Sequence, residues 1–159
     1  MPYSIAVQIA DALAAGLSEY TFSSPYASIE ATRRYVPDYE ARELSTIKVS
    51  VVPGPVETER GSRGMDLFTQ QVMVVIGKTV DGSNGDIDAL TNLGQEIMDA
   101  IRSDLLVTEG MPDSAKYFAC SMEVQFDRDS LTEKRVFLAQ IDVTYRVPRY
   151  VLDPPVEGE

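Results

Sequence analysis

The clearest pattern in the chain is an alternation of apolar and polar side chains at residues 135–147, RVFLAQIDVTYRV. The apolar side chains occupy the odd positions from 137 onward: Phe137, Ala139, Ile141, Val143, Tyr145 and Val147. Polar side chains occupy the even positions between them: Gln140, Asp142, Thr144 and Arg146. Because successive side chains of a strand point to opposite faces, this pattern predicts a long strand with one buried and one polar face.

Two segments carry helical periodicity. Residues 4–17 repeat an apolar side chain every four positions, and Ser4 is a suitable N-cap. Residues 86–106 carry an apolar stripe after Asp86, another suitable N-cap, and their opposite face holds five acids and one base. The first helix is expected to pack on the sheet. The second is expected to cover one side of it, with its acidic face in solvent.

Four further segments are predicted to be strands: 30–36, 46–52, 66–77 and 116–126. Pro53-Gly54-Pro55 is expected to end the second of these, and residues 57–64, ETERGSRG, to form the polar tip of a long hairpin. Residues 72–76 are apolar on both faces, which predicts a central strand covered on both sides.

Other segments complete the outline. Residues 38–44 are expected to hold a single helical turn, and 127–134 to be a polar connection. In 116–126 the alternate apolar side chains are expected to share one face: Phe118, Cys120, Met122, Val124 and Phe126.

The order of these elements predicts an α+β fold in a single domain over residues 1–147. The sheet is expected to be mostly antiparallel (mixed), with two helices packed on one face and one long hairpin. Residues 148–159, RYVLDPPVEGE after Pro148, are expected to form an extended, proline-rich, acidic C-terminal arm.

Composition excludes several kinds of chemistry. The 159 residues include no His, which removes the usual general base near neutral pH and the commonest metal ligand. The single Cys120 can form neither an intramolecular disulfide nor a zinc cluster. A net charge of −11 disfavours wrapping nucleic acid but would let DNA pass without sticking.

Targeting signals are also missing from the sequence. No apolar run is long enough to span a membrane, and residues near Met1 lack the pattern of a signal peptide. We therefore expect a cytoplasmic, reducing location without membrane contact.

No motif predicts a catalytic, cofactor or metal site. The acidic turn at 81–88 fails as a calcium loop because Gly85, Asp86 and Asn92 stand where oxygen, glycine and glutamate are required. The glycines at 54, 61 and 64 lack the Gly-Lys-Ser/Thr of a phosphate loop. Carboxylates are abundant, but nothing in the sequence pairs two of them in a cleft.

Charge is segregated along the chain. Residues 31–63 hold six bases against five acids, although the whole chain is strongly acidic. A near-neutral edge could meet the acidic face of a neighbouring copy in a head-to-tail contact. Scattered surface ion pairs, each of little energetic consequence, are the alternative explanation.

The element order and several phrases resemble one family. The phrases are RRYVPDYEARELSTIKVSVVPG, DLFTQQVMVVIG, IDALTNLGQEIMDAI and RVFLAQIDVTYRV, set after an N-terminal helix. Together, over about residues 1–147, they resemble the tail-terminator and neck or tail-completion proteins of long-tailed bacteriophages. The C-terminal arm departs from the smaller members of that family.

The resemblance implies a structural virion protein rather than an enzyme. Such proteins form a ring, commonly of six subunits, at the head-proximal end of the tail tube. The ring ends tube polymerisation and provides the surface for head–tail joining. The implied partners are further copies of the chain, the tail-tube protein and the neck or connector proteins, with assembly in the host cytoplasm.

The sequence is also compatible with three alternatives: another head–tail connector component, a cytoplasmic protein-binding adaptor, or a small enzyme working through carboxylates. The residues that we expect at a subunit interface or channel lumen come from the predicted hairpin, strands and arm: Arg33, Arg34, Glu57, Glu59, Arg60, Arg63, Gln140, Asp142, Thr144, Arg146, Tyr150 and Leu152.

Overall fold

The computed structural model describes residues 4–36, 39–81, 84–106, 108–123 and 125–150, which form one α+β domain around a five-stranded mixed sheet. The strands are β1 (Ala31–Arg33), β2 (Lys48–Ser62), β3 (Met65–Thr79), β4 (Lys116–Ser121) and β5 (Val136–Tyr150). The helices are α1 (Ile5–Glu19), the 3-10 helix η1 (Ala41–Ser45), α2 (Asn84–Arg102) and α3 (Arg128–Lys134). The order across the sheet is β1-β2-β3-β5-β4, and β1 and β2 are the parallel pair.

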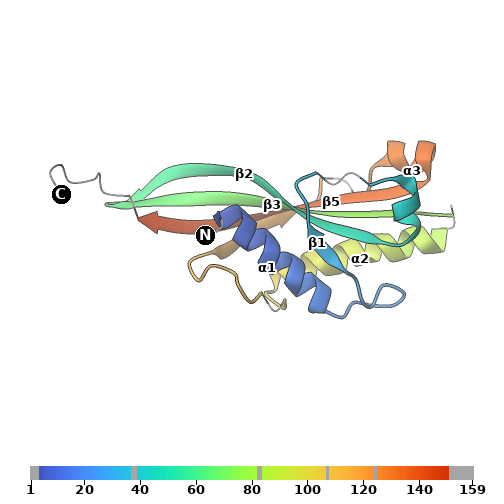
Figure 1. The fold of residues 1–159 in the computed structure, drawn as a ribbon, viewed down its shortest axis with the longest axis horizontal. Helices are drawn as coiled ribbons and strands as arrows, with labels where there is room; N and C mark the ends of the chain where they lie inside the picture. Colours follow the sequence, from blue (N-terminus) through green and yellow to red (C-terminus); the bar gives the residue numbers. More distant parts are fainter. Residues whose placement is uncertain (1–3, 37–38, 82–83, 107, 124, 151–159) are drawn as a thin grey trace.

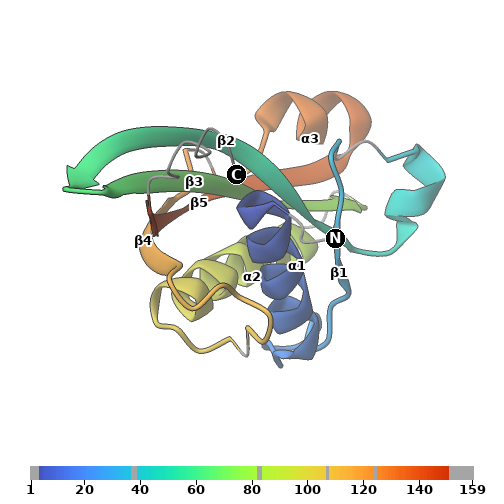
Figure 2. The same cartoon turned by 60° about the vertical axis from the view of Figure 1, so that its left-hand side comes forward.

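The core lies between the sheet and two helices. Figures 1 and 2 show α1 and α2 side by side beneath one face, which we call the helix-side face. The first helix contacts β1, β2 and β3, whereas the second contacts β4 and β5. All six odd positions of β5 from Phe137 to Val147 are buried, so the predicted alternation is confirmed. β5 is an interior strand of the sheet, between β3 and β4.

Among the described residues, η1 and α3 cover the opposite, outer face at one end (Figure 2). A Cβ added at Gly77 would lie 3.2 Å from Cδ2 of Leu44, so η1 packs closely on β3 there. Val74 on the helix side and Val75 on the outer side are both buried. Coverage on both faces is therefore confirmed at Val74 and Val75, whereas outer-facing Met73 is only partly buried.

At the other end, three strands extend beyond the helices as a narrow arm (Figure 1). We define the arm as residues 57–69 of the β2–β3 hairpin together with residues 146–150 of β5. The β3–β5 pairing is continuous here, whereas the β2–β3 pairing shifts register between Arg60 and Ser62. Gly64 lies at the tip with a φ of 76°, a left-handed conformation that favours glycine. The predicted long hairpin is thus confirmed, but residues 57–62 are strand rather than tip loop.

The expectation that Pro53-Gly54-Pro55 ends β2 is wrong. The strand continues past these residues through a bulge between Pro53 and Val56. Buried Gln70 holds the bulge, because its Nε2 donates to the carbonyl oxygens of Gly54 and Gln71, each at 2.9 Å. A Cβ at Gly54 would lie 3.0 Å from the Gln71 oxygen, so glycine permits this close approach.

The second predicted helix has different ends. Asp86 is not its N-cap, because the helix begins at Asn84 and Asp86 lies in its first turn. The helix ends at Arg102 because Asp104 adopts a left-handed conformation, with φ at 55°. The Asp104 and Leu105 amides then donate to the carbonyls of Ile101 and Ala100, a Schellman closure. Leu105 therefore leaves the apolar stripe and is 57% exposed.

The region around β4 also differs from expectation. A bulge between Tyr117 and Ala119 reverses the alternation, so Phe118 and Cys120 do not share a face. β4 ends at Ser121, and Val124 lies outside the described residues. Residues 128–134 form α3 rather than an irregular connection.

The N-cap of α3 is Asp127, whose side chain accepts from the Ser130 amide. Hydrogen bonding to Ser130 also lowers the pKa of the Asp127 carboxyl. Residues 148–150, expected in the C-terminal arm, belong to β5, and residues 151–159 lie outside the described residues.

Phe137 is fully buried where β5 meets the core, so its truncation provides a test of the fold. Phe137→Ala is expected to lower the free energy of unfolding by about 3–5 kcal/mol, because the cavity it leaves cannot fully collapse. Urea denaturation of this variant measures the loss, with Thr132→Ala on exposed α3 as the control. A loss below about 1 kcal/mol for Phe137→Ala would contradict the burial of this face.

Candidate interaction site on the outer sheet face

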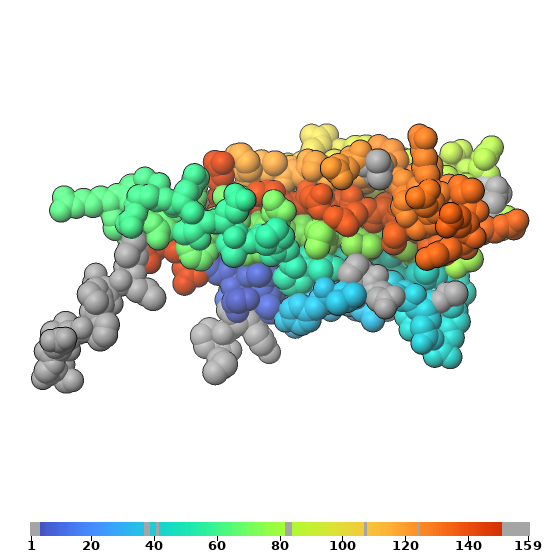
Figure 3. All heavy atoms as spheres, turned by 90° about the horizontal axis from the view of Figure 1, so that it is seen from above, coloured from blue at the N-terminus to red at the C-terminus, as the bar shows by residue number. Residues whose placement is uncertain are grey.

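Charged side chains of opposite sign stand on the two sides of the outer face, near the base of the arm. The acidic ones are on β2, and the basic ones are on the edge strand β4 and the adjoining β5. Thr69 of β3 pairs with Glu57 on one side and with Arg146 on the other, and Arg146 pairs with Lys116 of β4. Directly paired residues share a face of the sheet. One row across the outer face therefore holds, in order, Glu57, Thr69, Arg146 and Lys116. Glu59 lies on the same face two residues further along β2. Figure 3 views this face from above.

The guanidinium of Arg146 is held by an aromatic ring. Its Cζ lies 3.6 Å from the ring centroid of Phe118, within the range of a cation–π contact. The bulge in β4 brings Phe118 to the outer face, where it is 50% exposed. Arg146 Nε is buried without a hydrogen-bond partner among the described residues. Stacking, rather than an acceptor, therefore orients this side chain.

As predicted, the other polar side chains of the β5 alternation lie on the outer face: Gln140, Asp142 and Thr144. Gln140 is exposed, and its Nε2 donates to Asp142 Oδ1 at 2.9 Å and to Met73 Sδ at 3.3 Å. Asp142 and Thr144 are partly buried beside the strands that flank β5. Together with Arg146 they form a continuous polar stripe along the strand.

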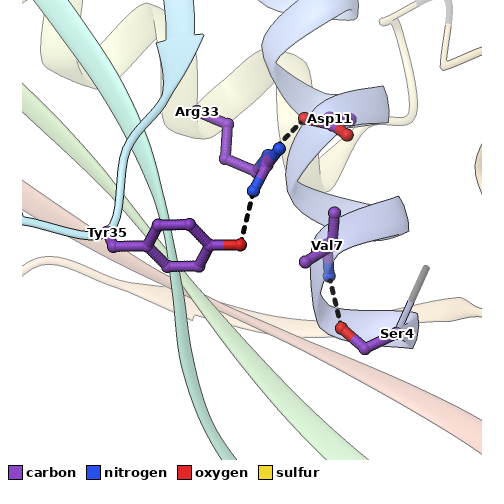
Figure 4. Close-up of polar contacts among 5 residues, drawn as sticks. All are labelled: Ser4, Val7, Asp11, Arg33 and Tyr35. Carbon is purple, nitrogen blue, oxygen red and sulfur yellow. Dashed lines mark hydrogen bonds and ion pairs between the residues drawn. The ribbon is translucent and has the colours of Figure 1, made fainter.

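The two arginines of β1 and its extension serve contacts within the subunit. Arg33 Nε lies 2.6 Å from Asp11 Oδ1 on α1, and its Nη1 donates to the Tyr35 hydroxyl at 2.7 Å (Figure 4). The hydrogen bond to Asp11 raises the pKa of the Arg33 guanidinium. Arg34 stacks over the Tyr39 ring, with 4.3 Å between Cζ and the centroid. Neither arginine joins the charged row.

The remaining predicted residues occupy the arm. Arg60 forms an ion pair with Asp66 across the hairpin, with 3.4 Å between Nε and Oδ1. Arg63 is exposed beside the tip glycine, and Tyr150 is 80% exposed at the end of β5. Leu152 lies outside the described residues.

Lys116 and Phe118 were not identified from the sequence as residues of an interaction site. Each stands near the start of a strand whose register against β5 cannot be read from the chain, so its position beside Arg146 was not foreseeable. The one available signal was the aromatic-rich KYFAC segment, which the alternation rule assigned to a single face. The bulge breaks that rule.

A second feature that was not predicted is a cavity of about 400 Å³ between α1, the end of α2 and strands β4 and β5. Tyr117 and Tyr145 line it, together with Asp104 and Asp113. Burial raises the pKa of the Tyr145 hydroxyl, and the nearby Asp104 charge adds to this effect. Burial and the hydrogen bond to Cys120 Sγ, at 3.3 Å, raise the pKa of Tyr117 to about 12.

The described part of the chain contains no group of three or more Cys, Asp and Glu side chains placed to hold a metal ion. Within the same residues, no helix has the length and apolar character needed to cross a membrane. No protein-family model matches the sequence, and no curated protein matches it.

The raised pKa of Tyr145 predicts a loss of stability at alkaline pH. Above its ordinary pKa of 10.0, the hydroxyl loses its proton in the unfolded chain but keeps it in the folded chain. The unfolded state then binds fewer protons, so the free energy of unfolding falls as the pH rises above about 10.

Urea denaturation at several pH values between about 9 and about 11.5 tests this expectation. The fall should be shallower for Tyr145→Phe than for the wild type, and unchanged for Tyr150→Phe, whose ring is exposed. Equal slopes for Tyr145→Phe and the wild type would contradict the assignment.

Proposed function

We propose that the protein is a structural subunit of a long-tailed bacteriophage, forming a ring at the head-proximal end of the tail. The ring, a hexamer in this proposal, ends polymerisation of the tail tube and joins the tail to the neck or connector. The observation that carries the proposal is the arm, which projects beyond the helices (Figure 1). Such an extension buries little surface within its own subunit and is suited to contact another.

Exposed apolar side chains on and near the arm support this proposal. Val56, at its base on β2, is 50% exposed, and Tyr150, at the end of β5, is 80% exposed. Exposed tyrosines such as Tyr150 commonly anchor protein interfaces. A subunit whose arm meets a different surface of its neighbour makes a head-to-tail contact, and repetition of such a contact generates a ring when the rotation between neighbours closes.

Charge is consistent with a channel for DNA. The chain carries a net charge of −11, so a ring of such subunits would repel phosphates and let DNA pass without specific binding. In this proposal the partners are other copies of the chain, the tail-tube protein and the neck proteins. The subunits assemble in the host cytoplasm, and the completed ring resides in the virion.

Native mass spectrometry of the purified chain, combined with negative-stain imaging beside tail tubes, tests the proposal. We expect a discrete oligomer with a central opening that caps one end of each tube. A ring that binds neck proteins but leaves tubes growing would instead identify an adjacent neck component. A monomer at every concentration, which neither caps tubes nor joins neck proteins, would exclude both.

A further inference from the structure

We infer that the two charged edges of the outer face meet each other between copies of the chain. In this contact the β2 edge of one subunit, with Glu57 and Glu59, lies against the β4 edge of the next, with Lys116 of β4 and Arg146 of the adjoining β5. The inference rests on the proposed ring in one respect: a second copy must be the neighbour.

The four charges do not pair with one another within one subunit. Glu57 and Arg146 lie on strands two positions apart, so about 10 Å separates their backbones, and Lys116 is one strand further away. None of the four forms an ion pair with another described residue.

Lys116 and Arg146 are moreover direct cross-strand neighbours of like charge. Such a pair disfavours the isolated sheet. An acidic partner surface would relieve the repulsion.

The open stretch of the β2 edge and the whole of β4 lie at the same level along the strand direction. β1 pairs with β2 only over Val49–Val51, so among the described residues no strand lies on the side of β2 away from β3 from Val52 onward. Following the register across the sheet, Ser121 of β4 is level with Val52 and Lys116 is level with Glu57. The whole of β4 therefore faces the part of β2 that β1 leaves open, if two subunits stand side by side with parallel arms.

Side chains rather than backbone would make this contact. Pro53 and Pro55 lack the amide N–H that a neighbouring strand requires, and the bulge between Pro53 and Val56 disturbs the edge further. Simple extension of the sheet is thereby discouraged. The positions of the opposite charges along the strands then determine that the β2 edge meets the β4 edge, and in what register.

The stacked pair on β4 and β5 is suited to the centre of the contact. Phe118 holds the Arg146 guanidinium in place and exposes half of its own surface beside it. An arginine whose orientation is already fixed loses less side-chain entropy when a carboxylate arrives. The same ring offers apolar area next to the charge.

Charge reversal tests the contact in the full chain. We expect Glu57→Lys/Glu59→Lys to weaken self-association roughly 10- to 100-fold, because both edges are then basic. Lys116→Glu/Arg146→Glu should do the same, with both edges acidic. An equimolar mixture of the two variants should associate again, because each edge then finds its complement on the other variant.

Mass photometry across a concentration series measures these equilibria. Glu123→Lys/Glu133→Lys and Arg128→Glu/Lys134→Glu are the matched controls, since they make the same charge changes at exposed positions away from the row. Thermal unfolding confirms that each variant folds. Lys116→Glu alone replaces its double variant if Arg146→Glu fails to fold.

The outcomes separate the inference from the proposed function. Wild-type protein that oligomerises, with variants that do so equally well or a mixture that stays dissociated, would overturn the charged-edge contact and leave the ring intact. A wild type that remains monomeric at every concentration would overturn the ring and the contact together.

Discussion

The structure depends on burial of the helix-side face of β3 and β5 against α1 and α2. Fifteen consecutive pairs join these two strands without a shift in register. A slip by one residue would move Phe137 and its alternate partners from the core to the outer face, so the buried side chains fix the pairing. The outer face is specified by the same constraint, because each polar side chain of β5 must then point away from the helices.

The arm follows from continuation of the same strands beyond the helices. Val147 stays buried at its base, and Gln70 pins the bulge that carries β2 past its prolines. The arm is therefore a continuation of the core sheet. A side chain on its outer face keeps a defined height relative to β4, which is the property that a contact between neighbouring subunits requires.

Much of the fold could be predicted from periodicity, whereas the site could be predicted only in part. The alternation of six apolar positions in β5 and the apolar stripe of α1 could be predicted because each pattern repeats over many residues. The hairpin could be predicted from two strand patterns separated by a polar segment. The course of β2 through Pro53 was not, because a distant side chain, Gln70, holds the bulge. Glu57 and Arg146 were identified as candidates from the sequence. The position of Lys116 beside Arg146 was not, because it depends on the register of β4 against β5, and long-range pairing leaves no local signal.

If the arm and the β4 edge of this chain meet another copy of it, amide hydrogen exchange will differ between dilute and concentrated protein. We expect slower exchange on assembly in residues 53–62 and 116–121, with little change in α3. Unchanged exchange in both segments of an assembled oligomer, or protection confined to α3, would contradict it.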